Sequence, residues 1–398
     1  MTLRWGTACR RRAARFLGAG LTLGLAWLTA LHAGGVRAED NDVLPPPMLI
    51  SLPPLDLPPS VDQRVDHVAS ASLLSDGRIA VLGSTAPAEN GFLRIFDPKS
   101  GTEEDHYWVG NDGAGPTSAS VETIGDAVFI FGTGGSLWRV SKQDVLVSDV
   151  DFGRDTAFGS TTVSGAMLVD GKSVLLSWWE ATPSRNEFCG NGAVVARLSP
   201  EGKVIWRWQD RQGGFYFPND MVVLADSTIL VLVEGSPNEY MGTMWNPCVH
   251  GWEYLVALSP DGHEIARRTL PRRVWLGPLS LSWDGKEALG AVGSDIFVGA
   301  AEAIMRIRVE SGRILWDRVN IAAKIDGLFY EETIVTSLEK GGYLAFPAHG
   351  PLAVKLDEGG EAARIYSRPV DLTGLCGVQL GRGVLCGSGD MFALLPLQ

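Results

Sequence analysis

Six side chains that can bind a cation or move a proton stand near the ends of β-rich stretches in this 398-residue sequence. They are Asp66, His67, Asn219, Asp220, His250 and His349. Carboxylate and amide oxygens are the ligands that hard cations prefer, and imidazole suits transition metals. If the fold gathers these side chains, they can hold a divalent cation such as calcium. The alternative is structural, because an aspartate at a strand entrance caps a turn by accepting backbone N–H bonds. We expect no other cofactor.

A second group with binding chemistry lies in residues 234–253, EGSPNEYMGTMWNPCVHGWE. Aromatic rings stand beside polar side chains there, a combination that suits recognition of a protein or a carbohydrate. The residues that we assign to partner binding are Asn238, Glu239, Tyr240, Trp245, His250 and Trp252. The alternative is that the aromatic rings only pack this long stretch onto its own scaffold.

The first 38 residues have the composition of a secretory signal peptide. Arginines between Arg4 and Arg15 precede an apolar run from Phe16 to Leu31, and Val36-Arg37-Ala38 ends the segment. The apolar run has 16 residues, fewer than the ~20 residues that a membrane span needs. We therefore predict cleavage after Ala38 and a periplasmic or secreted protein without a membrane span. An uncleaved N-terminal anchor is the alternative.

The chain after Ala38 is strongly acidic. Removing the leader takes away six basic residues, which leaves 28 Lys and Arg against 46 Asp and Glu, a net charge of −18. Such a protein repels the phosphates of nucleic acids and of anionic membrane surfaces. This charge excludes both as expected partners and leaves an envelope or extracellular protein, or a glycan.

Four cysteines remain after cleavage, and an even number in an exported chain favours disulfides. We predict the pairs Cys189 with Cys248 and Cys376 with Cys386. The first pair would tie two long neighbouring loops, 180–192 and 234–253. The second pair would cross one hairpin. Four buried free thiols are the alternative.

A strand–turn–strand pattern recurs along the chain from residue 66 onward. Apolar residues alternate, a Pro/Gly/Asp turn follows, and apolar residues alternate again, as in 92–108, 194–210 and 254–270. Another apolar hairpin precedes each copy. Four antiparallel strands every 40 to 60 residues or so are typical of a β-propeller. We therefore predict an all-β, seven-bladed propeller of four-stranded antiparallel blades; a β-sandwich or two smaller β domains are the alternatives.

The seventh copy begins at 391–398 and lacks its outer strand. An unpaired edge would leave the ring open. We predict that residues 48–52 supply this missing strand. The expected organisation is a signal peptide at 1–38, a proline-rich linker with the closing strand at 39–65, and the propeller at 66–398.

Three stretches of the repeat pattern resemble known repeat families. The Ser-Pro-x-Gly-x-x-x-Trp pattern at 199–206 and the residues 310–316 are similar to pyrroloquinoline-quinone-type propeller repeats, and residues 73–101 look like a kelch-type blade. The resemblance implies a propeller in which Trp206 and Trp316 pack between blades. Quinone-dependent members often carry adjacent cysteines, and this chain has no Cys-Cys pair.

The triplet Pro218-Asn219-Asp220 resembles a short motif of the gluconolactonase family, which consists of metal-dependent propeller hydrolases. This resemblance implies a metal-ligand role for Asn219 and Asp220. In a propeller, the connections between the second and third strands and those into the next blade share one face. We expect the loops and ionisable residues named above to gather on that face, which we call the long-loop face.

No motif of a nucleophilic or phosphoryl-transfer enzyme occurs. The sequence contains no GxSxG, HExxH or GxxxxGK[ST] pattern and no EF-hand spacing. We therefore predict a monomeric exported propeller that binds a protein or glycan through its long disulfide-braced loops, without catalysis. The alternatives are a metal-dependent hydrolase or lyase that uses the Asp, Asn and His residues, and a purely structural or assembly role.

Overall fold

The computed structural model describes strands and turns of the unit Leu44–Gln398. The described residues are 48–51, 64–73, 78–86, 90–97, 99–100, 102–109, 120–124, 127–131, 136–141, 144–149, 163–169, 173–181, 190–199, 203–210, 214–235, 253–271, 274–294, 303–321, 333–347, 353–367, 376–379, 383–388 and 391–396. Within these ranges, no helix has the length and apolarity that a membrane crossing requires. The predicted signal peptide lies outside the described residues.

Four sheets have four strands each, and in all of them the neighbouring strands are antiparallel. The first has β2 (Arg64–Leu73), β3 (Ile79–Ala86), β4 (Asn90–Asp97) and β5 (Thr102–Val109). The second has β6 (Ser120–Ile124), β7 (Ala127–Phe131), β8 (Ser136–Ser141) and β9 (Asp144–Asp149). The third has β23 (Ile334–Ser337), β24 (Tyr343–Phe346), β25 (Ala353–Leu356) and β26 (Ala362–Tyr366). The fourth has β1 (Met48–Ser51), β27 (Cys376–Gln379), β28 (Gly383–Ser388) and β29 (Met391–Pro396).

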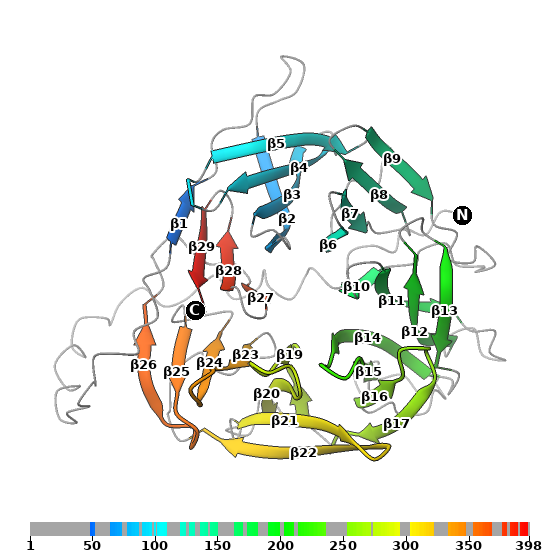
Figure 1. Cartoon of the computed structure of the whole chain (residues 1–398), viewed down its shortest axis with the longest axis vertical. Coiled ribbons are helices and arrows are strands. Elements are labelled where there is room, and N and C mark those ends of the chain that lie inside the picture. Colours follow the sequence, from blue (N-terminus) through cyan, green and yellow to red (C-terminus); the bar gives the residue numbers. More distant parts are fainter. Residues whose placement is uncertain are drawn as a thin grey trace, which may run out of the picture. The chain divides into compact units, whose positions relative to one another are not determined.

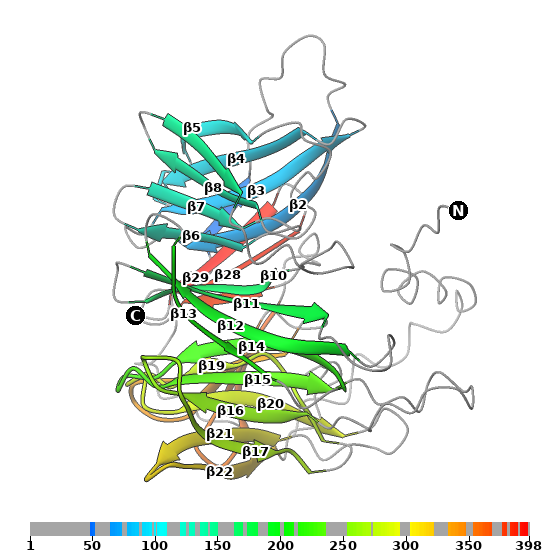
Figure 2. The ribbon, with the colours of Figure 1, turned by 90° about the vertical axis from the view of Figure 1, so that its right-hand side faces the viewer.

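Two further sheets are larger. A five-stranded sheet holds β18 (Val274–Leu276), β19 (Ser280–Leu281), β20 (Ala288–Ser294), β21 (Ala303–Glu310) and β22 (Arg313–Asn320). An eight-stranded sheet holds β10 (Val163–Val169), β11 (Ser173–Ala181), β12 (Gly190–Leu198), β13 (Val204–Gln209), β14 (Gly214–Val223), β15 (Ile229–Gly235), β16 (Tyr254–Leu258) and β17 (Glu264–Thr269). Figure 1 shows the sheets following one another around a ring in chain order, and Figure 2 shows the same sheets from the side.

The number of separate sheets differs from the predicted seven. The described residues form five separate blades and one eight-stranded sheet. Within the large sheet, β10–β13 and β14–β17 are two antiparallel runs, and a short parallel pairing of Gly190 and Asn191 with Gly214 and Phe215 joins them. Two adjacent strands that run in the same direction come close enough there to share backbone hydrogen bonds. The prediction of seven separate blades is therefore corrected, whereas the all-β propeller with four-stranded antiparallel blades is confirmed.

The strand β1 closes the last sheet from the other end of the chain. Met48 pairs with Leu394 and Ser51 pairs with Met391 in an antiparallel register along β29. This is the position that we predicted for residues 48–52. The strand β2 begins at Arg64, two residues before the predicted start of the propeller.

The strand β15 shows why the inner strands are apolar throughout. Leu230 and Leu232 pack in one core cluster toward the five-stranded sheet, whereas Ile229, Val231 and Val233 pack in another cluster toward β11–β13. Successive side chains of a strand point to opposite faces. Because a sheet covers each of these faces, both sets are buried and the strand reads as a continuous apolar run.

The two tryptophans of the repeat pattern are confirmed as packing residues. The indole Nε1 of Trp206 donates to the Pro260 carbonyl at 2.8 Å, and the ring lies against Gly262 in the turn of the neighbouring run. Trp316 packs against the core cluster between β14–β17 and the five-stranded sheet. The guanidinium of Arg268 lies over the Trp316 ring, 3.3 Å from its centre.

Candidate binding site

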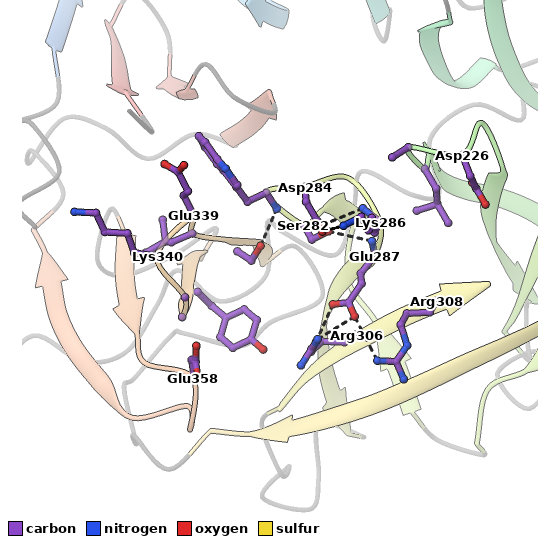
Figure 3. A pocket seen from close by; sticks show the side chains of 18 of the residues that line it. Asp226, Ser282, Asp284, Lys286, Glu287, Arg306, Arg308, Glu339, Lys340 and Glu358 are labelled. Atoms are coloured by element: carbon purple, nitrogen blue, oxygen red, sulfur yellow. Dashed lines mark hydrogen bonds and ion pairs between the residues drawn. The ribbon is translucent and has the colours of Figure 1, made fainter. Parts of the chain in front are cut away.

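A cavity of about 1260 Å³ opens across three consecutive parts of the ring. Its lining comes from the β14–β15 turn, the β19–β20 turn and the β23–β24 turn, together with the end of β21 and Glu358 after β25. Figure 3 shows these side chains facing a common space. In an antiparallel blade, the turns between strands one and two and between strands three and four share one face. The cavity thus lies on this face, which we call the hairpin face, opposite the long-loop face.

Short polar side chains fix the shape of each turn. The Asp226 carboxylate accepts the backbone N–H of Thr228 at 2.9 Å. The Asp284 carboxylate accepts the Ser282 hydroxyl at 2.8 Å and the backbone N–H of Lys286 at 3.2 Å. Aspartate favours such turns because its carboxylate replaces a backbone acceptor. The turns therefore hold their form without help from a ligand.

Hydrogen bonds also join the three turns to one another. The backbone N–H of Ala225 donates to the Gly285 carbonyl at 2.8 Å, and the backbone N–H of Trp283 donates to the Ser337 hydroxyl at 2.8 Å. Gly285 has a φ of +71°, which a residue with a side chain rarely adopts. The three turns consequently form one connected wall of the cavity.

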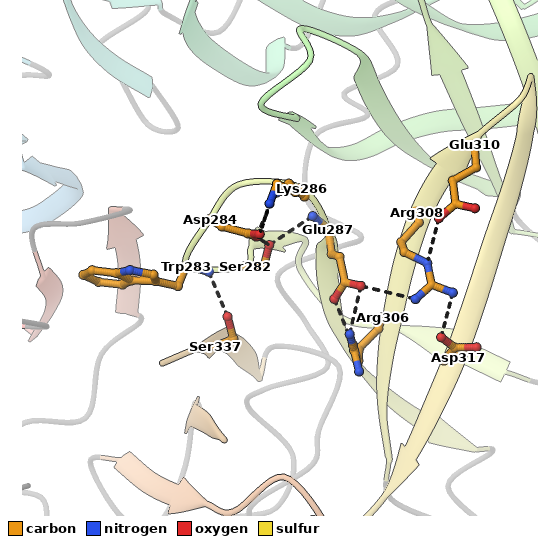
Figure 4. Close-up of polar contacts among 10 residues, drawn as sticks. All are labelled: Ser282, Trp283, Asp284, Lys286, Glu287, Arg306, Arg308, Glu310, Asp317 and Ser337. Carbon is orange, nitrogen blue, oxygen red and sulfur yellow. Dashed lines mark hydrogen bonds and ion pairs between the residues drawn. The ribbon is translucent and has the colours of Figure 1, made fainter. Parts of the chain in front are cut away.

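A group of ion pairs joins several residues of the cavity lining (Figure 4). Glu287 binds Arg306 through two bonds, at 2.8 Å to Nε and 2.9 Å to Nη2. It also lies 3.4 Å from Nη1 of Arg308, and Arg308 reaches Asp317 at 2.9 Å and Glu310 at 3.4 Å. The paired Glu287 raises the pKa of Arg306. Two-pronged Arg–carboxylate pairs fix orientation as well as charge, so this part of the lining is rigid.

The ionisable groups of the lining whose pKa is shifted all move away from neutral pH. The Asp284 carboxylate lies 2.9 Å from the Lys286 ammonium, and its hydrogen bonds with Lys286 and Ser282 lower its pKa to about 2. Burial raises the pKa of Tyr343. An acid–base catalyst needs a pKa near the working pH. These groups instead keep one charge state, which suits binding.

Of the predicted metal ligands, Asp220 is the one whose side chain is described. Its carboxylate accepts the backbone N–H of Met221 at 2.8 Å and that of Leu279 at 2.6 Å. Burial raises its pKa to about 6. Asp220 therefore ties β14 to the segment before β19, which is the structural role that an aspartate at a strand entrance can play.

The other predicted ligands stay untested. Asp66 and His67 lie in β2, and Asn219 lies in β14 where the register shifts between Pro218 and Asp220. His250 and His349 lie outside the described residues. Within the described part of the chain, no three His, Cys, Asp or Glu side chains are placed to hold a metal ion. The metal site remains a prediction.

The predicted partner-binding loop also falls outside the described residues. Its assigned residues are Asn238, Glu239, Tyr240, Trp245, His250 and Trp252. Cys189 and Cys248, which we predicted to pair, lie outside the described residues as well.

Cys376 and Cys386 are direct partners across the β27–β28 pair. Facing residues of antiparallel strands have Cα atoms about 4.5–5.5 Å apart, and a disulfide needs about 4.4–6.8 Å. The register thus permits this bridge, and both disulfides remain predictions.

Sequence reasoning missed the hairpin-face cavity. The residues that form it sit in short turns such as Ser282–Glu287, SWDGKE, and Leu338–Gly342, LEKGG. Taken alone, each turn has only the residue types that are common in turns. The signal that could have found the cavity is that an acidic residue recurs at the same turn of consecutive units, as Asp226, Asp284 and Glu339.

Comparison with known proteins identifies the class of fold. No family model matches the chain, and its sequence matches no curated protein. Among solved structures, it is similar to Raptor from Chaetomium thermophilum, with a TM-score of 0.53 and 10% identity over 88% of this chain and 28% of that chain. It is also similar to hydrazine synthase from Kuenenia stuttgartiensis, with a TM-score of 0.50 and 13% identity over 75% of this chain and 79% of that chain.

A third similar structure is BamB from Moraxella catarrhalis, with a TM-score of 0.49 and 11% identity over 83% of this chain and 86% of that chain. At such low identity a likeness shows the fold and not the activity. The chain is thus an all-β propeller protein. These comparisons do not show the predicted relation of residues 73–101 to kelch-type blades.

Proposed function

We propose that this chain is an exported propeller that binds a protein partner and does not catalyse a reaction. The observation that carries the proposal is the hairpin-face cavity with its fixed charges. Its ion pairs are already formed, and its shifted groups have pKa values far from neutrality. Such a surface is preorganised for recognition, and preorganisation reduces the free-energy cost of binding.

The size of the cavity favours a protein over a small molecule. Small-molecule pockets usually enclose about 300–1,000 Å³, whereas this cavity has about 1260 Å³ and spans three parts of the ring. The connections 180–192 and 234–253, which the sequence predicts on the long-loop face, are a second proposed contact surface, braced by the proposed disulfides. We also propose a periplasmic or secreted location, in line with the predicted signal peptide.

A second candidate function is a metal-dependent hydrolase or lyase, for which Asp220 is one proposed ligand. The carboxylate of Asp220 is occupied by two backbone N–H groups. One of these bonds, from Leu279, holds neighbouring segments of the ring together. The carboxylate therefore has a structural role that does not depend on a metal, and the binding proposal rests on the cavity.

Affinity capture from an envelope extract tests this function. We suggest three baits: the full chain, a chain in which a short turn replaces 234–253, and a full chain with Trp283→Ala. We expect a partner that the full chain retains and that at least one altered bait loses. Equal recovery from all three baits would contradict recognition through these surfaces.

A further inference from the structure

We propose that the hairpin-face cavity binds a cationic segment of the partner, one that presents arginine or lysine side chains. The inference rests on the proposed binding function, because it names the chemistry of the partner at this cavity. It depends on three features of the described residues: the charge balance of the lining, the position of Trp283, and the rigidity of the wall.

Carboxylates outnumber cations around the cavity. The lining holds six acidic residues, Asp226, Asp284, Glu287, Glu310, Glu339 and Glu358, and four basic residues, Lys286, Arg306, Arg308 and Lys340. Three of the cations have carboxylate partners inside the lining. These pairs thus neutralise most of the positive charge of the lining, and the cavity keeps an excess of negative charge.

Two of the carboxylates are available to a ligand. Glu339 and Glu358 are exposed, and neither forms an ion pair with another residue of the described chain. They stand on the same side of the cavity, on the turn after β23 and the turn after β25 (Figure 3). The side chain of Glu358 lies close beside Gly341, where any larger residue would meet it. A cation that entered here would therefore find two unpaired carboxylates.

Trp283 supplies an aromatic surface at the same cavity. Its side chain is half-buried and points away from the Arg306–Glu287 pair (Figure 4). A guanidinium or ammonium group binds favourably over an indole face. The protein itself uses this contact elsewhere, where Arg268 lies over Trp316 and also donates to the Ile314 carbonyl at 2.8 Å. An incoming arginine can make the same kind of contact with Trp283.

The rigid wall limits the cost of binding. Backbone bonds from Ala225 to Gly285 and from Trp283 to Ser337 fix the three turns relative to one another. Less conformational entropy is then lost when a ligand enters. The strong negative charge of the whole chain also steers cationic partners toward it. A neutral glycan would stack on the indole and could donate hydroxyl hydrogen bonds to the two carboxylates, but it would not gain the ionic attraction that a cation gains.

A titration with defined peptides tests the inference. The probe is a fluorescent heptapeptide with alternating arginine and alanine, and the matched probe has citrulline at each arginine, which keeps the shape and removes the charge. Anisotropy is measured on the full chain in low salt. We expect binding of the arginine peptide only, weakened by high salt because salt screens exposed charges.

Two charge-matched double variants localise the binding. Glu339→Gln with Glu358→Gln removes the free carboxylates of the cavity, and Glu104→Gln with Asp261→Asn removes two exposed acids elsewhere. The cavity variant should bind about tenfold more weakly, because two exposed charge pairs with the peptide are lost. The control variant should bind like the wild type. Trp283→Ala should weaken binding as well.

Three results would overturn the inference. One is the absence of binding by the arginine peptide, and another is equal binding of the citrulline peptide. The third is an equal effect of both double variants. Should a glycan array instead show binding that Trp283→Ala abolishes, the ligand is a sugar. If affinity capture still retains a partner when the arginine peptide does not bind, the proposed function stands and this inference alone fails.

Discussion

The stability of the ring should depend on pH through the single carboxylate of Asp220. Burial raises its pKa from the ordinary 3.8 to about 6. Between these values the folded chain holds a proton that the unfolded chain has released. The free energy of unfolding therefore falls as the pH rises from about 4 to about 6, and then stays constant as far as this group is concerned. The shift corresponds to about 3 kcal/mol, since one pKa unit is about 1.4 kcal/mol.

The variant Asp220→Asn isolates this contribution. Asparagine cannot ionise, so it lacks the penalty of a buried charge at neutral pH, although it can accept only one of the two backbone bonds. The lost bond costs the same at every pH. We expect the stability of the wild type relative to the variant to fall by about 3 kcal/mol between about pH 4 and about pH 7.

Urea unfolding followed by tryptophan fluorescence at several pH values measures the difference. All other titrating groups are shared, so they cancel in the comparison. Val222→Ala, on the same strand, is a control whose cost does not vary with pH, because neither side chain ionises. A difference between wild type and Asp220→Asn that is flat with pH, or that grows as the pH rises, would refute the assigned role of this carboxylate.

Three further predictions concern packing and closure. Gly262→Ala should lower the midpoint of thermal unfolding by more than Gly312→Ala does. Both glycines have a positive φ, which strains a residue with a side chain by about 1–2 kcal/mol. A Cβ at Gly262 would also meet the Trp206 ring 2.6 Å away, whereas nothing lies within 4 Å of a Cβ at Gly312. Equal costs would contradict the packing of this turn. Deleting residues 48–52 should lower the midpoint of thermal unfolding, because β29 loses its partner along four residues; an unchanged midpoint would mean that ring closure adds nothing. Mass spectrometry of the unreduced protein should show Cys376 bonded to Cys386, and free thiols at both would rule out the bridge.

The sequence was most informative where one pattern repeats. Alternating apolar residues and Pro/Gly turns predicted the hairpins, and the missing outer strand of the last copy predicted the place of Met48–Ser51. The count of separate sheets could not be predicted in this way. The fused sheet depends on the contact of Gly190 and Asn191 with Gly214 and Phe215. That contact is set by how closely two runs approach in space and not by any local pattern.

The candidate site was even less predictable. Its lining combines turns that are about 55 residues apart in the chain, as when Trp283 binds Ser337. The sequence allows Asp220 to be a metal ligand or a structural acceptor, and the structural role depends on the contact with Leu279, 59 residues away. Each residue looked like an ordinary turn or cap in isolation. Only the ring arrangement brings their charges to one cavity.

The pairing of β1 with β29 also restricts the order in which the molecule can be completed. β1 is the first described strand and β29 is the last, so contacts within every other sheet are far more local than this one. Pairing strands that are distant in sequence is slow, because a long loop must close first. A chain that crosses a membrane with its N-terminus leading would expose β1 first and would have to keep its edge unpaired until β29 arrived. If the chain is exported as we propose, completion of the ring follows translocation of the whole chain.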